Sequence, residues 1–206
     1  MSQLINDLFQ GRDKQRLMSE VYEAYARTPV LQQLASGKRL VPGAGPLDSP
    51  LAIIAEAPGE QEDRKGEPLI GPAGQLLQKL FRRAGLPWEL CYRTNVLPWR
   101  PPGNRTPYPF EVIASRQRLR AELTLVSPLV VVCCGATAWS GLSQDGLDLG
   151  GFADRCGSWV PEHYDTWRLL VIRHPSAILR ERGAARTELE DLTVSLLSSV
   201  LEGTGD

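Results

Sequence analysis

The sequence predicts an α/β fold of three layers, α/β/α, with a central four-stranded parallel sheet. Four short segments that are expected to be strands alternate along the chain with segments of helical periodicity, which is typical of strands joined through helices. Such units cross over with a fixed hand and build a parallel sheet. The run LVVVCC at 129–134 is almost entirely apolar, as expected of a central strand that is covered on both faces.

Three of the expected strands are short apolar runs next to residues that do not extend a strand, and the segment CYRTNVL is expected to form another. The run LAIIAE lies between two prolines, and the run RLLVIR precedes a His-Pro pair. We expect strands over residues 51–56, 91–97, 129–134 and 168–173.

The expected helices carry apolar side chains at the 3.6-residue period. A Thr-Pro pair ends the first helix, and Gly85 ends the second. The third is expected to bury Val112, Ile113, Leu119, Leu123 and Val126. We expect helices over residues 1 to about 27, 73–84, 110–126 and 189–201.

Length and composition limit the class of protein. Since no repeat or linker divides the 206 residues, we expect a single domain over 1–206, with residues 1–40 as an N-terminal helical arm packed on it. The net charge of -1 excludes a polycation that coats nucleic acid by charge alone. No apolar run approaches the ~18 residues of a membrane span, and no secretory signal begins the chain. Because 4 cysteines are too few for a disulfide framework, we expect a cytoplasmic protein.

Glycine and proline gather where the apolar runs end. The 19 Gly and 16 Pro residues cluster in segments such as EAPGE, LIGPAG and WRPPGNRTPYP. We interpret these segments as shaped loops, which often carry functional sites.

Three polar residues lie at or near the carboxyl ends of expected strands and therefore meet at one edge of the sheet: Glu56, Asn95 and His174. An amide can read the edge of a pyrimidine ring. A carboxylate can position water or stabilise a cationic sugar, and an imidazole can donate to a departing base. Each residue alone is more often structural, as a solvated carboxylate, a turn cap or a turn histidine. Together they suit cleavage of an N-glycosidic bond.

Three motifs carry a resemblance to a known family. The segments AEAPGEQEDRKGEPLIGPAGQLL, TNVLPWRPPGNRTP and HPSAILR, at 55–77, 94–107 and 174–180, resemble the uracil-DNA glycosylase superfamily, closest to its family-4 type. The resemblance extends from about Leu40 to the C-terminal helix and implies a uracil-DNA-glycosylase-like fold.

The resemblance assigns a role to each matching position. The implied catalytic residues are Glu56 and His174. The implied base-binding residues are Ala57, Gly59, Glu62, Leu69 and Asn95. The implied DNA-binding residues are Arg100, Asn104, Arg105, Ser176, Ile178 and Arg180, with Ile178 as the apolar wedge that fills the hole left by a flipped nucleotide. Near the start of a helix, however, an isoleucine is at least as often a core residue.

The sequence departs from the family in two places. Family-4 enzymes hold an iron–sulfur cluster on four cysteines, but residues 28–34 contain none, and Trp99 and Ser115 stand at the other two positions. We therefore expect no metal and no cofactor, with the N-terminal helix and Trp99 filling that space. The second departure is Leu69, which replaces a phenylalanine that stacks on the base; a lost stack costs about 1–3 kcal/mol.

Arginines gather near the expected site. Residues 93–120 contain six Arg and one acid, and residues 168–186 contain five Arg and one acid. This local charge predicts a basic face for DNA.

These observations predict a monofunctional DNA glycosylase. It would flip a pyrimidine nucleotide, hydrolyse its N-glycosidic bond, release uracil or a related modified pyrimidine and leave an abasic site. No lysine stands out for lyase chemistry. The expected partner is DNA, with no membrane contact, and the expected state is a monomer.

Two alternatives remain open. One is a glycosylase for a bulky, for example glucosylated, phage pyrimidine that acts in anti-phage defence, which Leu69 and the missing cysteines would suit. The other is a non-catalytic DNA-binding module. Covalent capture of the abasic product is disfavoured because the loop after Asn95 has no histidine.

Overall fold

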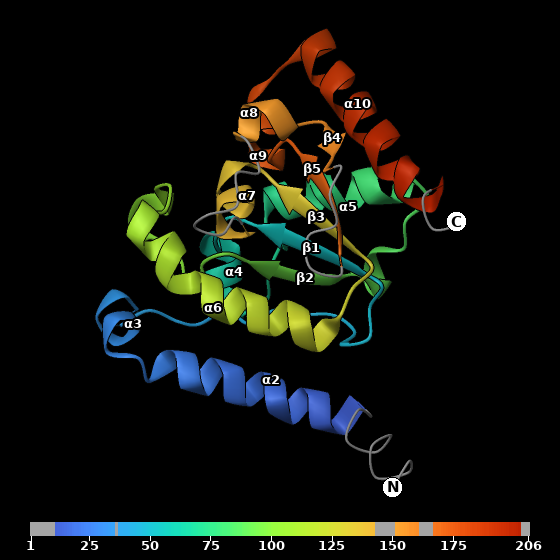
Figure 1. Ribbon diagram of the computed structural model, residues 1–206. Helices are drawn as coiled ribbons and strands as arrows, with labels where there is room; N and C mark the ends of the chain where they lie inside the picture. The colour runs from blue at the N-terminus through green and yellow to red at the C-terminus, as the bar shows by residue number, and fades with distance from the viewer. Residues whose placement is uncertain (1–10, 36, 143–150, 161–166, 203–206) are drawn as a thin grey trace, which may run out of the picture.

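The computed structural model describes residues 11–35, 37–142, 151–160 and 167–202 (Figure 1). Fourteen α-helices and β-strands follow one another in this part of the chain. In order they are α2 (Gly11–Ala26), α3 (Pro29–Leu34), β1 (Leu51–Ala55), α4 (Glu60–Lys65), α5 (Pro72–Arg83), β2 (Tyr92–Asn95), α6 (Pro109–Val126), β3 (Val130–Cys134), α7 (Ala136–Leu142), α8 (Phe152–Arg155), β4 (Ser158–Trp159), β5 (Arg168–Ile172), α9 (Pro175–Arg180) and α10 (Gly183–Glu202).

The sheet confirms the predicted α/β class and adds one strand. Its order is β2-β1-β3-β5-β4, and the first four strands are parallel at the predicted positions. The predicted count of four is wrong, because the two-residue strand β4 pairs antiparallel with β5. A strand of two residues is too short to leave an alternating pattern in the sequence.

Side chains that alternate along the strands build two hydrophobic cores, one on each face of the sheet. Cys133 belongs to the core under α6 and α7, and its neighbour Cys134 to the core under α5, α9 and α10. Strand residues alternate between faces, so the three predicted layers are confirmed. In Figure 1, α6 and α10 lie on opposite sides of the strands.

Two helices depart from their predicted boundaries or faces. Helix α10 begins at Gly183 rather than at residue 189, since its exposed first turns carry no apolar period. Helix α6 exposes Ile113, at 53%, so its predicted burial is wrong. The sequence analysis does not predict the short helices α3, α4, α7, α8 and α9.

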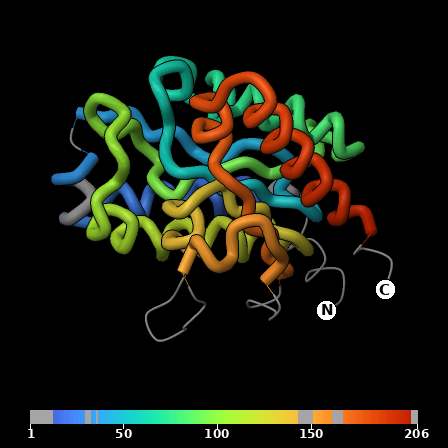
Figure 2. Tube along the Cα trace, turned by 90° about the horizontal axis from the view of Figure 1, so that it is seen from above, coloured from blue at the N-terminus to red at the C-terminus, as the bar shows by residue number. Residues whose placement is uncertain are grey.

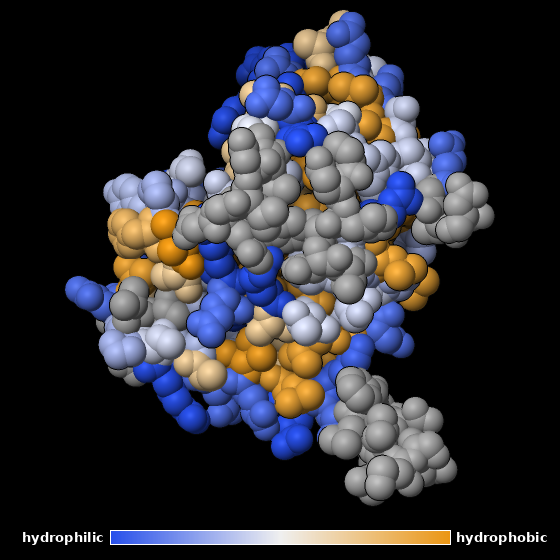
Figure 3. All heavy atoms as spheres, viewed as in Figure 1, coloured by the Kyte–Doolittle hydropathy of each residue, from blue (hydrophilic) through white to orange (hydrophobic). Residues whose placement is uncertain are grey.

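The N-terminal arm packs on α6, beside the β2 edge of the sheet (Figure 1). Helix α2 buries Met18 and Tyr25 in the core under α6. Figure 3 shows an apolar band where α2 meets α6, with hydrophilic side chains below it on the outer surface of α2. The first ten residues of the predicted helix lie outside the described residues. No helix in the described ranges has the length and apolar character that crossing a membrane requires.

Candidate active site

A cavity of about 790 Å³ opens at the edge where the parallel strands end. It is lined by the loop after β1 with α4, by the end of β2, and by α9. Figure 2 shows the α4 segment (teal) next to the α9 segment (orange-red). Of the residues predicted from the sequence, the cavity brings together Glu56, Ala57, Gly59, Glu62, Leu69, Asn95, Asn104, Arg105, His174, Ser176 and Arg180. Arg100 and Ile178 do not line it.

The carboxylate of Glu56 is held by a residue that the sequence analysis did not single out. Glu56 is half-buried directly after β1, and the hydroxyl of Thr137 donates to its Oε2 at 2.6 Å. Thr137 lies in the first turn of α7, which follows β3. In the sequence, the only indication that Thr137 belongs to the site is its position just after a buried strand. The contact fixes one oxygen of the carboxylate and leaves the other for substrate or water.

His174 is placed by the start of α9. Its Nδ1 accepts a hydrogen bond from the backbone N–H of Ser176 at 3.2 Å and lies 2.7 Å from the hydroxyl of the same residue. Because Nδ1 is an acceptor, the proton of a neutral ring sits on Nε2, which can then donate. Burial lowers the pKa of His174 below its usual range, Glu56 raises it, and Arg180 lowers it further. The ring is therefore neutral near pH 7.

Asn95 ends β2 and presents an unsatisfied amide. The residue is only 3% exposed, and its Nδ2 has no hydrogen-bond partner among the residues that the structure describes. A buried donor without an acceptor costs about 1–3 kcal/mol. Because Asn95 lines the cavity, a ligand oxygen could satisfy this donor.

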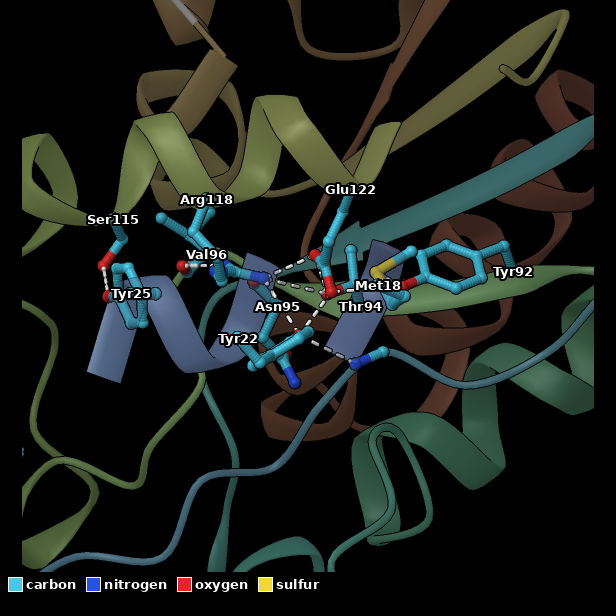
Figure 4. A network of polar contacts seen from close by, with 11 residues as sticks. Met18, Tyr22, Tyr25, Tyr92, Thr94, Asn95, Val96, Ser115, Arg118 and Glu122 are labelled. Atoms are coloured by element: carbon cyan, nitrogen blue, oxygen red, sulfur yellow. Dashed lines mark hydrogen bonds and ion pairs between the residues drawn. The ribbon is translucent and has the colours of Figure 1, made fainter. Parts of the chain in front are cut away.

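A buried polar network holds the end of β2 from behind (Figure 4). The guanidinium of Arg118, on α6, donates to the carbonyl oxygens of Asn95 and Val96 at 2.7 and 2.6 Å. Arg118 also pairs with Glu122, one turn later on the same helix. Both side chains are fully buried, so each charge depends on the other for compensation.

The N-terminal arm completes this network. The hydroxyl of Tyr22 donates to Glu122 and accepts from the N–H of Gly43 at 2.9 Å. Thr94 donates to the other oxygen of Glu122 at 2.9 Å. Burial, together with Glu122, raises the pKa of Tyr22 above its usual range, so the phenol stays protonated and donates. Helix α2 thus supports the strand that carries Asn95.

Glu62 frames the cavity rather than presenting a free carboxylate to it. Its two oxygens accept hydrogen bonds from the backbone N–H groups of Gly59, Ile70 and Gly71, at 3.2, 3.0 and 2.6 Å. The carboxylate therefore ties the loop after β1 to the start of α5. A carboxylate with three such donors shapes the pocket.

Leu69 adopts a strained backbone at the wall of the cavity. Its φ is 58°, in the left-handed region that costs a residue with a side chain about 1–2 kcal/mol. The turn leaves so little room that a Cβ on Gly74 would lie 1.9 Å from the carbonyl oxygen of Leu69. Leu69 is 8% exposed, so its side chain forms the wall where the resemblance places an aromatic ring.

The predicted wedge position is wrong in this structure. Ile178 is fully buried in the core under α5 and α10, because it lies on the inner face of α9. Its neighbour Leu179 is half-buried and lines the cavity. The sequence could not decide which of two consecutive apolar residues faces inward.

The predicted basic face is smaller than the sequence count suggested. Arg93 and Arg118 are buried and bonded to backbone carbonyls. Arg105 forms a two-point ion pair with Glu111, and Arg100 donates to Asn104 at 2.6 Å. Arg180 is exposed at the cavity. Several of the counted arginines therefore serve the fold.

The positions that match the iron–sulfur ligands of the related family carry an unsuitable donor set. Trp99 is fully buried and stacks on Tyr25, with ring centroids 6.1 Å apart. The Tyr25 hydroxyl lies 2.9 Å from the hydroxyl of Ser115. Cys133 and Cys134 point to opposite faces, and the described residues contain no cluster of His, Cys, Asp and Glu that could hold a metal. Residues 28–34 contain no cysteine, and an indole and one hydroxyl do not fit a cluster that thiolates hold.

Comparison with known proteins decides the family. Residues 42–197 match the model of the Uracil DNA glycosylase superfamily. The chain belongs to this superfamily. The matched region contains β1, β2, β5 and α9, so it covers every strand end of the cavity.

Curated relatives carry the name Type-4 uracil-DNA glycosylase. The protein from Thermotoga maritima is 34% identical over 87% of this chain and 93% of its own length. The protein from Pyrobaculum aerophilum is 33% identical over 70% of this chain and 75% of its own length. The protein from Saccharolobus solfataricus is 37% identical over 69% of this chain and 68% of its own length. This superfamily member is therefore related to the type-4 proteins along most of its length.

Proposed function

We propose that this chain is a monofunctional DNA glycosylase that flips a uracil nucleotide out of DNA, hydrolyses its N-glycosidic bond and leaves an abasic site. The observation that carries the proposal is the buried Nδ2 of Asn95, which has no hydrogen-bond partner in the described part of the chain and belongs to a cavity that Glu56 and His174 also line. The names of the relatives favour uracil as the base and DNA as the partner.

The base edge is read by Asn95. Uracil presents a carbonyl oxygen and a ring N–H side by side, and an amide presents the matching donor and acceptor. The unsatisfied Nδ2 would donate to the uracil oxygen and gain a partner on binding. Cytosine presents an amino donor at that position, so the same amide orientation rejects it.

Bond cleavage separates charge, and the two other residues stabilise the two parts. The sugar becomes cationic, and the carboxylate of Glu56 would stabilise it and orient the attacking water. The base leaves as an anion, and the Nε2–H of neutral His174 would donate to its oxygen. Water adds to the sugar carbon, and the departing base takes up a proton.

Two further assignments belong to this proposal. Leu179, in place of Ile178, would fill the hole left by the flipped nucleotide. The chain would also function without an iron–sulfur cluster, since the matching positions offer no thiolates. Iron analysis of the purified protein should then find no stoichiometric iron, and a stoichiometric amount would contradict this assignment.

The experiment is a single-turnover assay on an oligonucleotide with one uracil, with the released base identified by mass spectrometry. We expect free uracil, strand breakage only after alkali, and loss of release in Asn95→Ala and His174→Ala. Parallel substrates with cytosine and with bulky modified pyrimidines measure the choice of base. Tight DNA binding without release of any base, at excess enzyme, would refute the proposal and favour a non-catalytic module.

A further inference from the structure

A cluster of large apolar side chains is exposed at the start of α6. Tyr108 is 49% exposed, Phe110 55% and Ile113 53%. In Figure 3, an apolar patch lies at the left edge, over this part of the chain. Isolated apolar side chains on a surface are ordinary, but a contiguous group marks an interaction site.

Two of these side chains form an ordered aromatic surface, which we call the aromatic platform (Tyr108 and Phe110). Their ring centroids are 5.6 Å apart at an angle of 19°, so the rings are stacked. The guanidinium carbon of Arg105 lies 3.8 Å from the centre of the Tyr108 ring. A planar cation and two aromatic rings are thus stacked together.

The platform is held in place by Glu111. The carboxylate accepts two hydrogen bonds from Arg105, at 2.7 and 2.9 Å, and one from the backbone N–H of Tyr108 at 2.8 Å. Glu111 is itself buried, which limits the motion of all three groups. A preformed surface binds a planar ligand without first having to order its own side chains.

The platform begins at the rim of the candidate active site. Arg105 and Thr106 line the cavity, and Tyr108 and Phe110 follow within a few residues. Every nucleobase has a flat face that stacks on aromatic rings and on guanidinium planes. Exposed Arg180 supplies positive charge for the phosphates that would connect such a base to the flipped nucleotide.

We propose that the aromatic platform binds an unpaired nucleobase of the same DNA strand that delivers the flipped nucleotide. This inference rests on the proposed action on DNA, and it adds a preference for single-stranded or locally opened substrates. In a closed duplex the neighbouring bases are stacked inside the helix and cannot reach the platform. The occupant is a base, not an apolar protein surface, because the patch consists of stacked rings beside a cation.

The test measures binding by fluorescence anisotropy, with the full chain and a labelled oligonucleotide, single-stranded or in a fully paired duplex. Phe110→Ala removes half of the platform and Phe110→Trp keeps an aromatic ring. Leu129→Ala is the matched control, because Leu129 is 60% exposed but lies at the opposite end of the parallel strands. A second probe places the fluorescent base 2-aminopurine beside the uracil, where stacking on a ring quenches its emission.

We expect Phe110→Ala to weaken single-strand binding about five-fold or more and to relieve the quenching. Duplex binding should change less than about two-fold, and Phe110→Trp should retain the wild-type affinity. No binding of the single strand, an unchanged affinity in Phe110→Ala, or equal losses on single strand and duplex would overturn the proposal. Another outcome would also overturn the proposal: the wild type self-associates, and Phe110→Ala abolishes this self-association without changing the DNA affinity. The platform would then bind a second copy of this chain. The binding test does not depend on release of a base. If the chain released no base, the proposed function would be refuted, but its binding to DNA would still test the aromatic platform.

Discussion

Arg118 donates to the backbone carbonyl of Asn95 at 2.7 Å and so anchors, from inside the core, a residue that lines the cavity. The anchor is charged and buried, and Glu122 compensates it. Among the described contacts, no other charged side chain forms a hydrogen bond with the backbone of Asn95. The orientation of its amide therefore depends on a helix that does not line the cavity.

We predict that Arg118 is a positioning residue for Asn95. The double variant Arg118→Gln, Glu122→Gln removes both charges and avoids an unpaired one. Since a misplacement of about 1 Å in an active site can cost roughly 100-fold, we expect base release to fall ten- to hundred-fold. Inhibition by free uracil should weaken in parallel, while DNA affinity stays unchanged. Single-turnover kinetics and uracil inhibition measure the two effects.

The control is a second helical pair with the same spacing, Arg186 and Glu190 on α10. Its double glutamine variant should lower the melting temperature without affecting uracil inhibition. If the Arg118 variant lost only thermal stability, the positioning role would be refuted.

Gly74→Ala should destroy the wall of the cavity. The new Cβ would meet the carbonyl oxygen of Leu69 at 1.9 Å, so the strained Leu69 turn must move. We expect base release to fall about 100-fold in a single-turnover assay. Arg82→Ala, an exposed change on the same helix, should leave the rate unchanged. A normal rate in Gly74→Ala would mean that the Leu69 turn is not needed for activity.

The pH dependence should report the neutral state of His174. Because its folded pKa lies below the ordinary value of about 6.5, the folded state resists protonation. Its contribution to stability is complete above about pH 6.5 and is lost as pH falls through the lower folded pKa. Base release should decline in the same direction, since a protonated Nδ1 no longer accepts from Ser176.

NMR titration of the histidine ring measures this pKa directly. Arg180→Gln removes a positive neighbour and should raise the pKa of His174 toward its ordinary value. A wild-type pKa of His174 at or above 6.5 would show that the fold does not lower this pKa, and it would refute the pH dependence expected from a neutral ring.

The two consecutive apolar residues of α9 should behave differently. Ile178→Ala leaves a cavity in the core and should destabilise the fold by about 2–5 kcal/mol in denaturant unfolding. Leu179→Ala should leave stability nearly unchanged and slow uracil release from a duplex more than from a single strand. The reverse pattern would restore Ile178 as the wedge.

The sequence predicted the elements that follow simple periods. The strands beginning near 51, 130 and 168 are predictable because each is a short apolar run, as buried strands often are. The ends of the strands near 51, 92 and 168 located Glu56, Asn95 and His174. Contacts across long sequence separations left no such pattern. Thr137 meets Glu56 across 81 positions, and nothing in the local sequence of either indicates the other. Arg93 and Arg118 were counted as a basic surface because charge alone does not reveal burial.

The contact between Tyr22 and Glu122 spans 100 positions, and it joins the first described helix to the middle of the chain. During synthesis at about 5–20 residues per second, α2 leaves the ribosome roughly 5–20 s before its partner on α6. In that interval the surface of α6, against which α2 packs, does not yet exist. Helix α2 can therefore reach its final place only when α6 is complete, shortly before β3 is made, and the end of β2 acquires its support at that late moment.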